Sequence, residues 1–242
     1  MTWRVGTLVD AHDETATARS LRLRVDDWPG HVAGQHVDIR LTAPDGYTAT
    51  RSYSIASAPA GDDIEVTVEE LPDGEVSPYL VRSVSVGDRL ELRGPLGGWF
   101  VWRAAQTEPV QLIGGGSGVV PLMCMLRAHG QAGSSAPIRL LYSVRSPDAI
   151  FYRAEVLAAA DEARDRTTVV FTRDAPPGWP RPPARLDTDV LARETWPARV
   201  APTCYVCGPT GFVEAVSELL VRAGHEPSRI RTERFGATGG RP

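Results

Sequence analysis

Three side chains in residues 51–57, Arg51-Ser52-Tyr53-Ser54-Ile55-Ala56-Ser57, could together bind a charged aromatic molecule. The arginine can bind a phosphate through charge-assisted hydrogen bonds, the flat ring of Tyr53 can cover an aromatic face, and Ser54 can bond a polar ring atom. An edge strand with alternating polar residues would show the same pattern without any ligand. Taken alone, this motif leaves both interpretations open.

A second segment, Leu71-Pro72-Asp73-Gly74-Glu75-Val76-Ser77-Pro78-Tyr79-Leu80, could bind an anion. It is typical of a turn that opens onto a short helix over residues 78–82, with Ser77 as the N-cap and Pro78 at the first helical position. Free amide groups and the dipole at a helix start favour a negatively charged group. The alternative is a capped surface helix that binds nothing.

A third segment, Gly114-Gly115-Gly116-Ser117-Gly118-Val119-Val120-Pro121, is rich in glycine. It lies between a predicted strand and a predicted helix, which is the context that a nucleotide-binding loop needs. Without side chains, the backbone of such a loop can approach a pyrophosphate closely. A tight turn that is required only for packing is the alternative.

Cys204 and Cys207 stand in the segment Cys204-Tyr205-Val206-Cys207-Gly208-Pro209, a spacing that occurs in metal and dithiol sites. A zinc site needs about four ligands, and the sequence offers no second pair of cysteines and no nearby histidine. We therefore expect Cys204 to be structural and predict no metal site.

Together these motifs resemble those of the ferredoxin-NADP reductase family. Residues 51–54 resemble its Arg-x-Tyr-Ser flavin signature, and residues 74–77 its pyrophosphate-binding Gly-x-x-Ser segment. Residues 114–121 resemble its Gly-Gly-Gly-x-Gly-x-x-Pro nucleotide loop, and residues 207–209 its Cys-Gly-Pro motif. Thr232-Glu233-Arg234-Phe235-Gly236 is similar to the Glu-x-Phe segment of oxygenase-type reductases. The resemblance covers nearly the whole chain.

The resemblance implies an enzyme that holds FAD, rather than FMN, and accepts hydride from NADPH or NADH. The residues that it assigns to the flavin are Arg51, Tyr53, Ser54, Gly74, Val76, Ser77 and Phe235. Those that it assigns to the nucleotide are Gly115, Gly116, Ser117, Gly118, Pro121, Cys207, Gly208 and Pro209. Cys207 and Ser54 would flank the stacked rings as catalytic residues, and hydride would pass to flavin N5 through positioning.

The 2′-phosphate of NADPH would need basic side chains in the adenosine pocket. Arg145, Arg173 and Arg185 follow successive predicted strands, where NADP-using relatives resemble this sequence. All 26 basic residues are arginine, so each of the three could equally be a solvated surface charge. We predict NADPH as the donor and keep NADH as the alternative.

The electron acceptor is expected to be a separate protein. In many relatives a ferredoxin domain with four cluster cysteines follows, whereas this sequence ends at Pro242 without them. An iron-sulfur, haem or oxygenase component would then take the electrons. The alternatives are a flavin reductase or diaphorase, and a non-catalytic electron-transfer subunit. The phosphate-binding segment argues against the first, and the glycine loop with the Cys-Gly-Pro motif argues against the second.

Two groups of elements must position these residues. Alternating apolar residues at 21–25, 37–41 and 64–68 predict half-buried strands, and hence an antiparallel barrel over residues 1–104. The resemblance makes it a six-stranded FAD-binding barrel. After residue 109, strands and helices alternate, which predicts a parallel α/β nucleotide-binding domain over residues 109–242. We expect its strands at 110–113, 138–142, 168–172, 203–206 and 230–235, and its helices at 119–128, 153–164 and 211–222.

The composition narrows the partners and the compartment. A net charge of −4 gives no reason to expect nucleic acid or an anionic membrane as the main partner. Three cysteines and a start without an apolar signal segment indicate a soluble, cytoplasmic protein. Residues 110–126 are uncharged, but their glycines and Pro121 would break a membrane-spanning helix.

Overall fold

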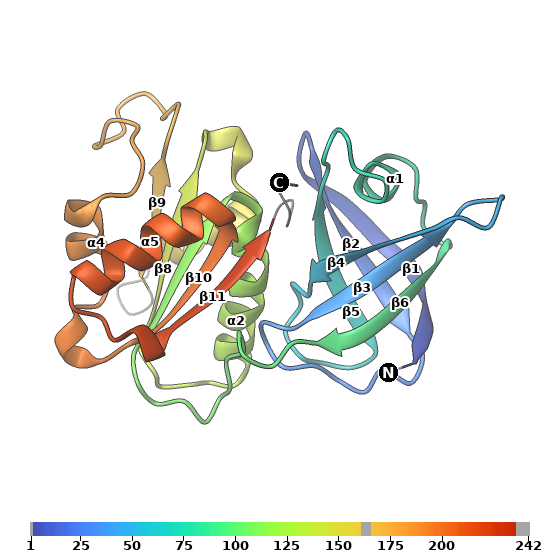
Figure 1. Cartoon of the computed structure of the whole chain (residues 1–242), viewed down its shortest axis with the longest axis horizontal. Coiled ribbons are helices and arrows are strands. Elements are labelled where there is room, and N and C mark those ends of the chain that lie inside the picture. Colours follow the sequence, from blue (N-terminus) through green and yellow to red (C-terminus); the bar gives the residue numbers. More distant parts are fainter. Residues whose placement is uncertain (1, 161–165, 236–242) are drawn as a thin grey trace, which may run out of the picture. The chain divides into compact units, whose positions relative to one another are not determined.

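The computed structural model describes residues 2–160 and 166–235 (Figure 1). Contacts between residues divide the chain into two compact units. The first comprises the residues up to Ala104 together with Met123–Gly133. The second comprises Ala105–Leu122 and the residues from Ser134 onward.

The first unit is built on a six-stranded antiparallel sheet, as predicted. Its strands are β1 (Trp3–Thr15), β2 (Ala18–Val25), β3 (His36–Thr42), β4 (Thr48–Ser54), β5 (Asp63–Glu69) and β6 (Arg89–Leu96), in the order β4-β3-β6-β1-β2-β5. The two end strands meet where Ile55 bridges Val66. Beside this bridge the Ala56 amide donates to the Glu65 carbonyl at 2.7 Å, and the Glu65 amide donates to Ser57 Oγ at 3.0 Å. These bonds close the sheet into a barrel.

Alternation along the strands fills the barrel core. Leu21, Leu23 and Val25 of β2 are fully buried, whereas Arg22 and Arg24 between them are exposed. Burying one such apolar side chain contributes about 1.5–3 kcal/mol. The pattern of period two therefore decides which face of each strand is inside.

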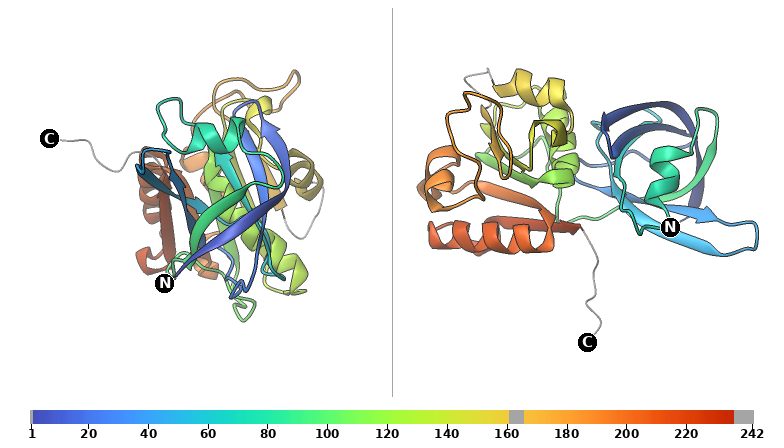
Figure 2. Two further views of the ribbon diagram at one scale, coloured as in Figure 1. Left: turned by 90° about the vertical axis from the view of Figure 1, so that its right-hand side faces the viewer. Right: turned by 90° about the horizontal axis from the view of Figure 1, so that it is seen from above.

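The second unit is a five-stranded sheet in which every pair is parallel. Its strands are β7 (Val110–Gly115), β8 (Ile138–Val144), β9 (Arg166–Phe171), β10 (Thr203–Pro209) and β11 (Ile230–Phe235), in the order β11-β10-β7-β8-β9. Helices α4 (Thr188–Glu194) and α5 (Thr210–Arg222) cover one face, and α3 (Arg153–Ala160) covers the other (Figure 2). The predicted parallel α/β architecture is confirmed.

The connections in this sheet create a switch point beside β7. From β7 the chain continues outward to β8 and β9, and it then returns to add β10 and β11 on the other side of β7. The strand order therefore reverses between β7 and β10, and in open parallel sheets ligands bind at the carboxyl ends of the strands at such a switch point.

Some element boundaries differ from the predictions. Helix α2 (Val119–Gln131) is longer than expected, and α4 was not predicted. Helix α3 ends at Ala160, and residues 161–165 of the helix predicted over 153–164 lie outside the described residues. Helix α1 (Ser77–Arg82) begins at Ser77, so the prediction that Ser77 is the N-cap and that Pro78 opens the helix is wrong. Within the described ranges, no helix has both the length and the apolar composition that crossing a membrane requires.

Candidate functional site

The strand that carries Arg51, Tyr53 and Ser54 is β4, and one of its edges is open. Along its length β4 pairs with β3, and among the described residues its ladder to β5 is limited to the isolated bridge at Ile55. An unpaired strand edge presents N–H and C=O groups to whatever lies beside it. The barrel therefore offers polar backbone next to the first motif.

Ser54 lies at the end of this open edge and is only 4% exposed. Its Oγ atom has no hydrogen-bond partner among the described residues. A buried hydroxyl without a partner costs about 1–3 kcal/mol, so such groups are uncommon and call for an explanation. A polar atom of a bound ligand would satisfy Ser54, which fits the flavin that the motif predicts.

Tyr53 is half-buried and packs against the barrel core. Burial raises the pKa of its hydroxyl well above the usual value of 10.0, against the opposing effect of the Arg51 charge. The phenol is therefore neutral at physiological pH, and its ring is held by the core as a flat apolar surface.

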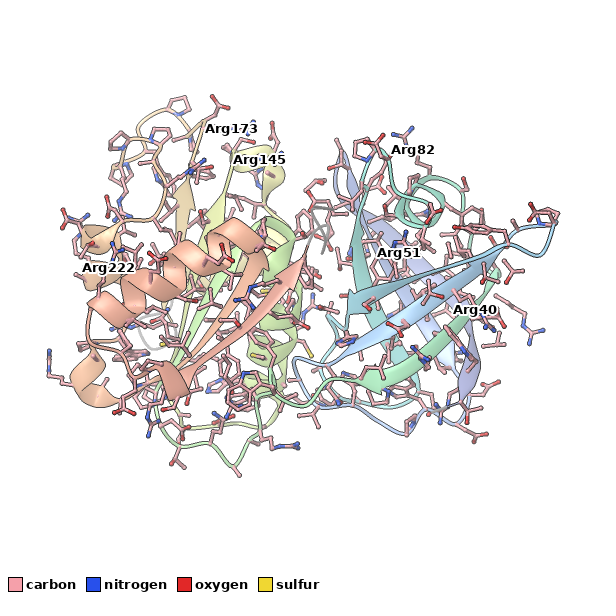
Figure 3. All side chains as sticks on the ribbon, viewed as in Figure 1. Arg40, Arg51, Arg82, Arg145, Arg173 and Arg222 are labelled. Carbon is pink, nitrogen blue, oxygen red and sulfur yellow. The ribbon has the colours of Figure 1, made fainter. Side chains whose placement is uncertain are left out.

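Arg51 links the first motif to the second. Its Nη2 donates to Glu75 Oε2 at 2.6 Å, and its Nη1 donates to the Thr50 carbonyl at 2.8 Å. Figure 3 shows Arg51 on the barrel, where half of its side chain (52%) is exposed. The structure thus brings Arg51 beside the loop that was predicted to bind a pyrophosphate.

The buried side chain of Ser77 stabilises the turn of residues 71–77 by a hydrogen bond across it. Ser77 Oγ accepts a hydrogen bond from the Leu71 amide at 3.0 Å, and both Val76 and Ser77 are buried. A Cβ atom on Gly74 would lie 2.7 Å from Ser77 Oγ and 3.0 Å from the Leu71 carbonyl oxygen. Gly74 and Ser77 therefore have a structural role in this turn, whether or not a ligand binds. Phosphate binding by Gly74, Val76 and Ser77 stays a prediction.

In the second unit, the glycine-rich segment begins with Gly114 and Gly115 at the end of β7 and leads through the short turn Gly116–Gly118 into α2. Gly116 has φ +55° and open space where a side chain would lie, so its backbone can be approached. A Cβ on Gly115 would lie 2.8 Å from the Phe212 ring, and one on Gly118 would collide with the carbonyl of Cys207. Two of these glycines therefore serve packing, and Gly116 is the one that fits a ligand.

The packing of Gly118 brings the glycine loop against the Cys-Gly-Pro segment. Gly114 and Cys207 are register partners on the adjacent strands β7 and β10, and both segments leave the sheet at its carboxyl edge. In parallel α/β sheets, ligands bind at this edge, at the switch point of the strand order. The two motifs predicted to bind a nucleotide therefore meet at the switch point.

The remaining predicted residues of these motifs lie beside this point. Gly208 and Pro209 end β10, Ser117 is half-buried in the short turn, and Pro121 lies buried in the first turn of α2. Phe235 at the end of β11 is half-buried and is the register partner of Pro209.

Cys207 is fully buried, and its pKa is raised well above 9.0 by burial and, second, by the charge of Glu233. The group is therefore a neutral thiol, suited to contact and positioning and not to nucleophilic attack. Glu233 is its register partner on β11, and burial raises the pKa of the Glu233 carboxyl to about 7. The Glu-x-Phe segment predicts Phe235 as a site residue, and it also contains Glu233, which the resemblance alone does not assign to the site.

Arg145 and Arg173 lie on neighbouring loops that are bonded to each other. The Arg145 carbonyl accepts hydrogen bonds from the amides of Arg173 and Asp174, both at 3.0 Å, and Figure 3 shows the two arginines at the same end of the sheet. Arg185 lies near the end of β9, because the Ala184 amide donates to the Phe171 carbonyl at 3.0 Å. All three side chains are exposed, and none forms an ion pair with a carboxylate of the described residues.

Comparisons with known proteins identify the family. Residues 6–101 match the model of the oxidoreductase FAD-binding domain, and residues 112–218 match that of the oxidoreductase NAD-binding domain. The chain is 31% identical over 236 residues to the ferredoxin–NAD(P)⁺ reductase component of the naphthalene 1,2-dioxygenase/salicylate 5-hydroxylase systems of a Ralstonia species. That alignment covers 97% of this chain and 69% of the relative. The chain belongs to the ferredoxin–NAD(P)⁺ reductase family.

Two further relatives support this membership. The reductase component of propane 2-monooxygenase from Mycolicibacterium smegmatis is 32% identical, with 77% of this chain and 54% of that protein aligned. The flavohaem-like FAD/NAD-binding domain of nitric oxide dioxygenase from Vibrio cholerae is 26% identical with a TM-score of 0.85, over 97% of this chain and 99% of that one. The chain thus spans 69% of the length of the relative from Ralstonia and 54% of that from Mycolicibacterium smegmatis.

The two matched domains are those of an oxidoreductase that uses FAD and NAD(P), as the motifs predicted. The unpartnered Ser54 hydroxyl at the open edge of β4 fits the flavin, and the open side of Gly116 at the switch point fits the nucleotide. The roles of the individual residues stay predictions.

Proposed function

We propose that this reductase accepts hydride from NADPH and passes the electrons to a separate redox protein. The observation that carries the proposal is the meeting of the glycine loop and the Cys-Gly-Pro segment at the switch point of the parallel sheet, in a chain whose barrel bears the flavin motif. When bound, FAD supplies a ring that takes up a hydride and can release electrons singly. A two-electron donor can then serve a one-electron acceptor.

The residues of this chain would act mainly by binding and positioning. Gly116 admits a pyrophosphate to the backbone, and the neutral thiol of Cys207 offers a buried, uncharged surface for a nicotinamide. In the barrel, Ser54 would fix a polar atom of the flavin, and Tyr53 would cover its ring. Glu233, with a pKa of about 7, can hold a proton at its carboxyl oxygen near neutral pH and release it as the pH rises.

A preference for NADPH over NADH is supported by Arg145, Arg173 and Arg185. Their side chains are exposed near the carboxyl ends of β8 and β9, and none of them forms an ion pair with a carboxylate of the described residues. A guanidinium binds a phosphate through two parallel hydrogen bonds, so even one of them in the adenosine pocket would discriminate the two nucleotides.

The acceptor we propose is an oxygenase component, a ferredoxin or a haem protein. The most direct support is the name of the relative from Ralstonia, which is the reductase component of oxygenase systems. We also propose that the protein works in the cytoplasm, because Cys124, Cys204 and Cys207 are all free thiols.

Anaerobic stopped-flow absorbance of the purified protein tests the proposal. Mixing with NADPH should rapidly bleach the flavin band at about 450 nm, and mixing with NADH should do so more slowly. A flavin band that neither nucleotide bleaches would indicate a non-catalytic electron-transfer subunit. Bleaching accompanied by release of free reduced flavin would indicate a flavin reductase.

Substitution of Cys207 by Ala should slow bleaching and leave FAD bound. Cys204→Ala is the matched control, because Cys204 is an equally buried thiol three positions earlier on the same strand. By contrast, Arg51→Ala should weaken FAD retention. If Cys207→Ala lost FAD while Arg51→Ala slowed the bleaching of tightly bound flavin, the assignment of both residues would be wrong.

A further inference from the structure

Glu75 lies between two hydrogen-bond donors. Its Oε2 accepts from Arg51 Nη2 at 2.6 Å, and its Oε1 accepts from the Tyr47 hydroxyl at 2.7 Å. The side chains of Arg51 and Glu75 are 52% and 47% exposed, and Tyr47 is 57% exposed. This cluster therefore faces solvent, with both oxygens of the carboxylate occupied.

The two donors keep the carboxylate ionised. The hydrogen bond from Tyr47 and then that from Arg51 lower the pKa of Glu75 below its usual value of 4.5. Conversely, Glu75 raises the pKa of the Tyr47 hydroxyl. At physiological pH Arg51 therefore has a negatively charged partner that comes from the loop following Gly74.

We propose that Glu75 competes with the phosphates of the flavin for Arg51 and thereby sets how tightly this reductase holds FAD. The inference rests on the proposed role of Arg51 as a phosphate ligand. A phosphate that approaches Arg51 must either displace Glu75 or share the guanidinium with a second anion. In the first case a charge-assisted hydrogen bond is lost, and in the second two negative charges lie close together.

Both terminal nitrogens of the Arg51 guanidinium already donate a hydrogen bond. Its Nη1 is already bonded to the Thr50 carbonyl at 2.8 Å, and its Nη2 is bonded to Glu75. Tyr47, in the turn before β4, holds the other oxygen of Glu75 and so keeps the carboxylate in place beside Arg51. Within the described residues, the side-chain hydrogen bonds of Glu75 are those to Arg51 and Tyr47, so the proposed competition acts on the guanidinium that would bind the flavin phosphates.

The substitution Glu75→Gln removes the charge and keeps the shape. We expect it to lower the dissociation constant for FAD by roughly three- to tenfold, the range that one exposed ion pair and a nearby like charge support. Tyr47→Phe should act in the same direction with a smaller effect, because the carboxylate loses only its second donor.

The measurement is titration of the flavin-depleted full chain with FAD, followed by quenching of the flavin fluorescence. Riboflavin, which has no phosphate, is titrated in parallel. Asp63→Asn is the matched control: it removes the same charge from another exposed arginine pair of the barrel, where Arg24 bonds Asp63 at 2.9 and 3.2 Å. Arg51→Ala and the double variant with Glu75→Gln complete a mutant cycle.

If the proposal is right, Glu75→Gln tightens FAD binding, leaves riboflavin binding unchanged and has no effect in the Arg51→Ala background. Asp63→Asn then changes the affinity for neither FAD nor riboflavin. Weaker or unchanged FAD binding by Glu75→Gln would overturn it, as would an equal gain for riboflavin. Should Arg51→Ala weaken FAD binding while Glu75→Gln fails to tighten it, the inference alone falls. Should Arg51→Ala leave FAD binding unchanged, the proposed role of Arg51 falls as well.

Discussion

Replacing Glu233 by glutamine should stabilise the nucleotide-binding unit above neutral pH and have little effect near pH 5. Burial raises the pKa of Glu233 from 4.5 to about 7. One pKa unit corresponds to about 1.36 kcal/mol, so ionising this carboxyl in the folded protein costs about 3 kcal/mol. Because the folded state binds the proton more tightly than the unfolded state, this part of the stability is lost as the pH rises from about 4.5 through 7. Glutamine stays neutral and escapes the loss.

Urea unfolding of both proteins at pH 5, 7 and 8.5, followed by circular dichroism, measures the effect. The advantage of Glu233→Gln in the free energy of unfolding should grow by about 2–3 kcal/mol between pH 5 and pH 8.5. Glu214→Gln on α5 is the control, because Glu214 is an exposed carboxyl of the same unit. A difference between Glu233→Gln and the unaltered protein that is the same at all three pH values would refute the reasoning.

Further predictions concern the nucleotide. Replacing Arg145 and Arg173 by Ala should raise the KM for NADPH by about tenfold and leave that for NADH unchanged in steady-state assays, while Arg222→Ala on α5, whose partner is Glu218, should alter neither. Equal effects on both nucleotides would contradict a 2′-phosphate site. Gly118→Ala should cost roughly 1–3 kcal/mol in urea unfolding, because the new methyl group meets backbone. Gly130→Ala is the control, because Gly130 lies in α2 with open space where the methyl group would be, and it should be neutral or stabilising by up to about 1 kcal/mol. Similar losses of stability for Gly118→Ala and Gly130→Ala would argue against the close packing of Gly118 on the Cys207 carbonyl.

Much of the fold could be predicted because the signals are local. Alternation along β2, β3 and β5 marks the face of each strand that is buried, whatever lies opposite.

The strand ends could not be predicted in the same way. β7 extends to Gly115 and β10 to Pro209, although glycine and proline disfavour strands, because Gly115 pairs with Ser143 of β8 and Pro209 with Phe235 of β11. Helix α4 did leave a signal, since Asp187 caps it by accepting from the Val190 amide at 2.8 Å.

The site was predictable as a set of motifs but not as a set of contacts. That Glu75 pairs with Arg51 depends on how two separate segments meet in the barrel, and that Ser77 Oγ bonds the Leu71 amide depends on how the turn folds. The raised pKa of Glu233 depends on burial, which the Glu-x-Phe spacing does not reveal. The sequence motifs therefore predict which residues belong to the site, whereas the hydrogen-bond partners and the protonation states of these residues depend on tertiary packing.

The bridge between Ile55 and Val66 closes the barrel immediately after the strand that carries Arg51 and Ser54. If β4 binds FAD as proposed, a fluctuation that opens the contact between Ile55 and Val66 should also loosen the flavin site, and local unfolding should then be coupled to flavin loss. A ligand that binds only the closed form adds its binding free energy to the stability of that form. We therefore expect the amide hydrogens of Ala56 and Glu65 to exchange with solvent more slowly as FAD is added. The decrease in their exchange rates should follow the fraction of protein that has FAD bound.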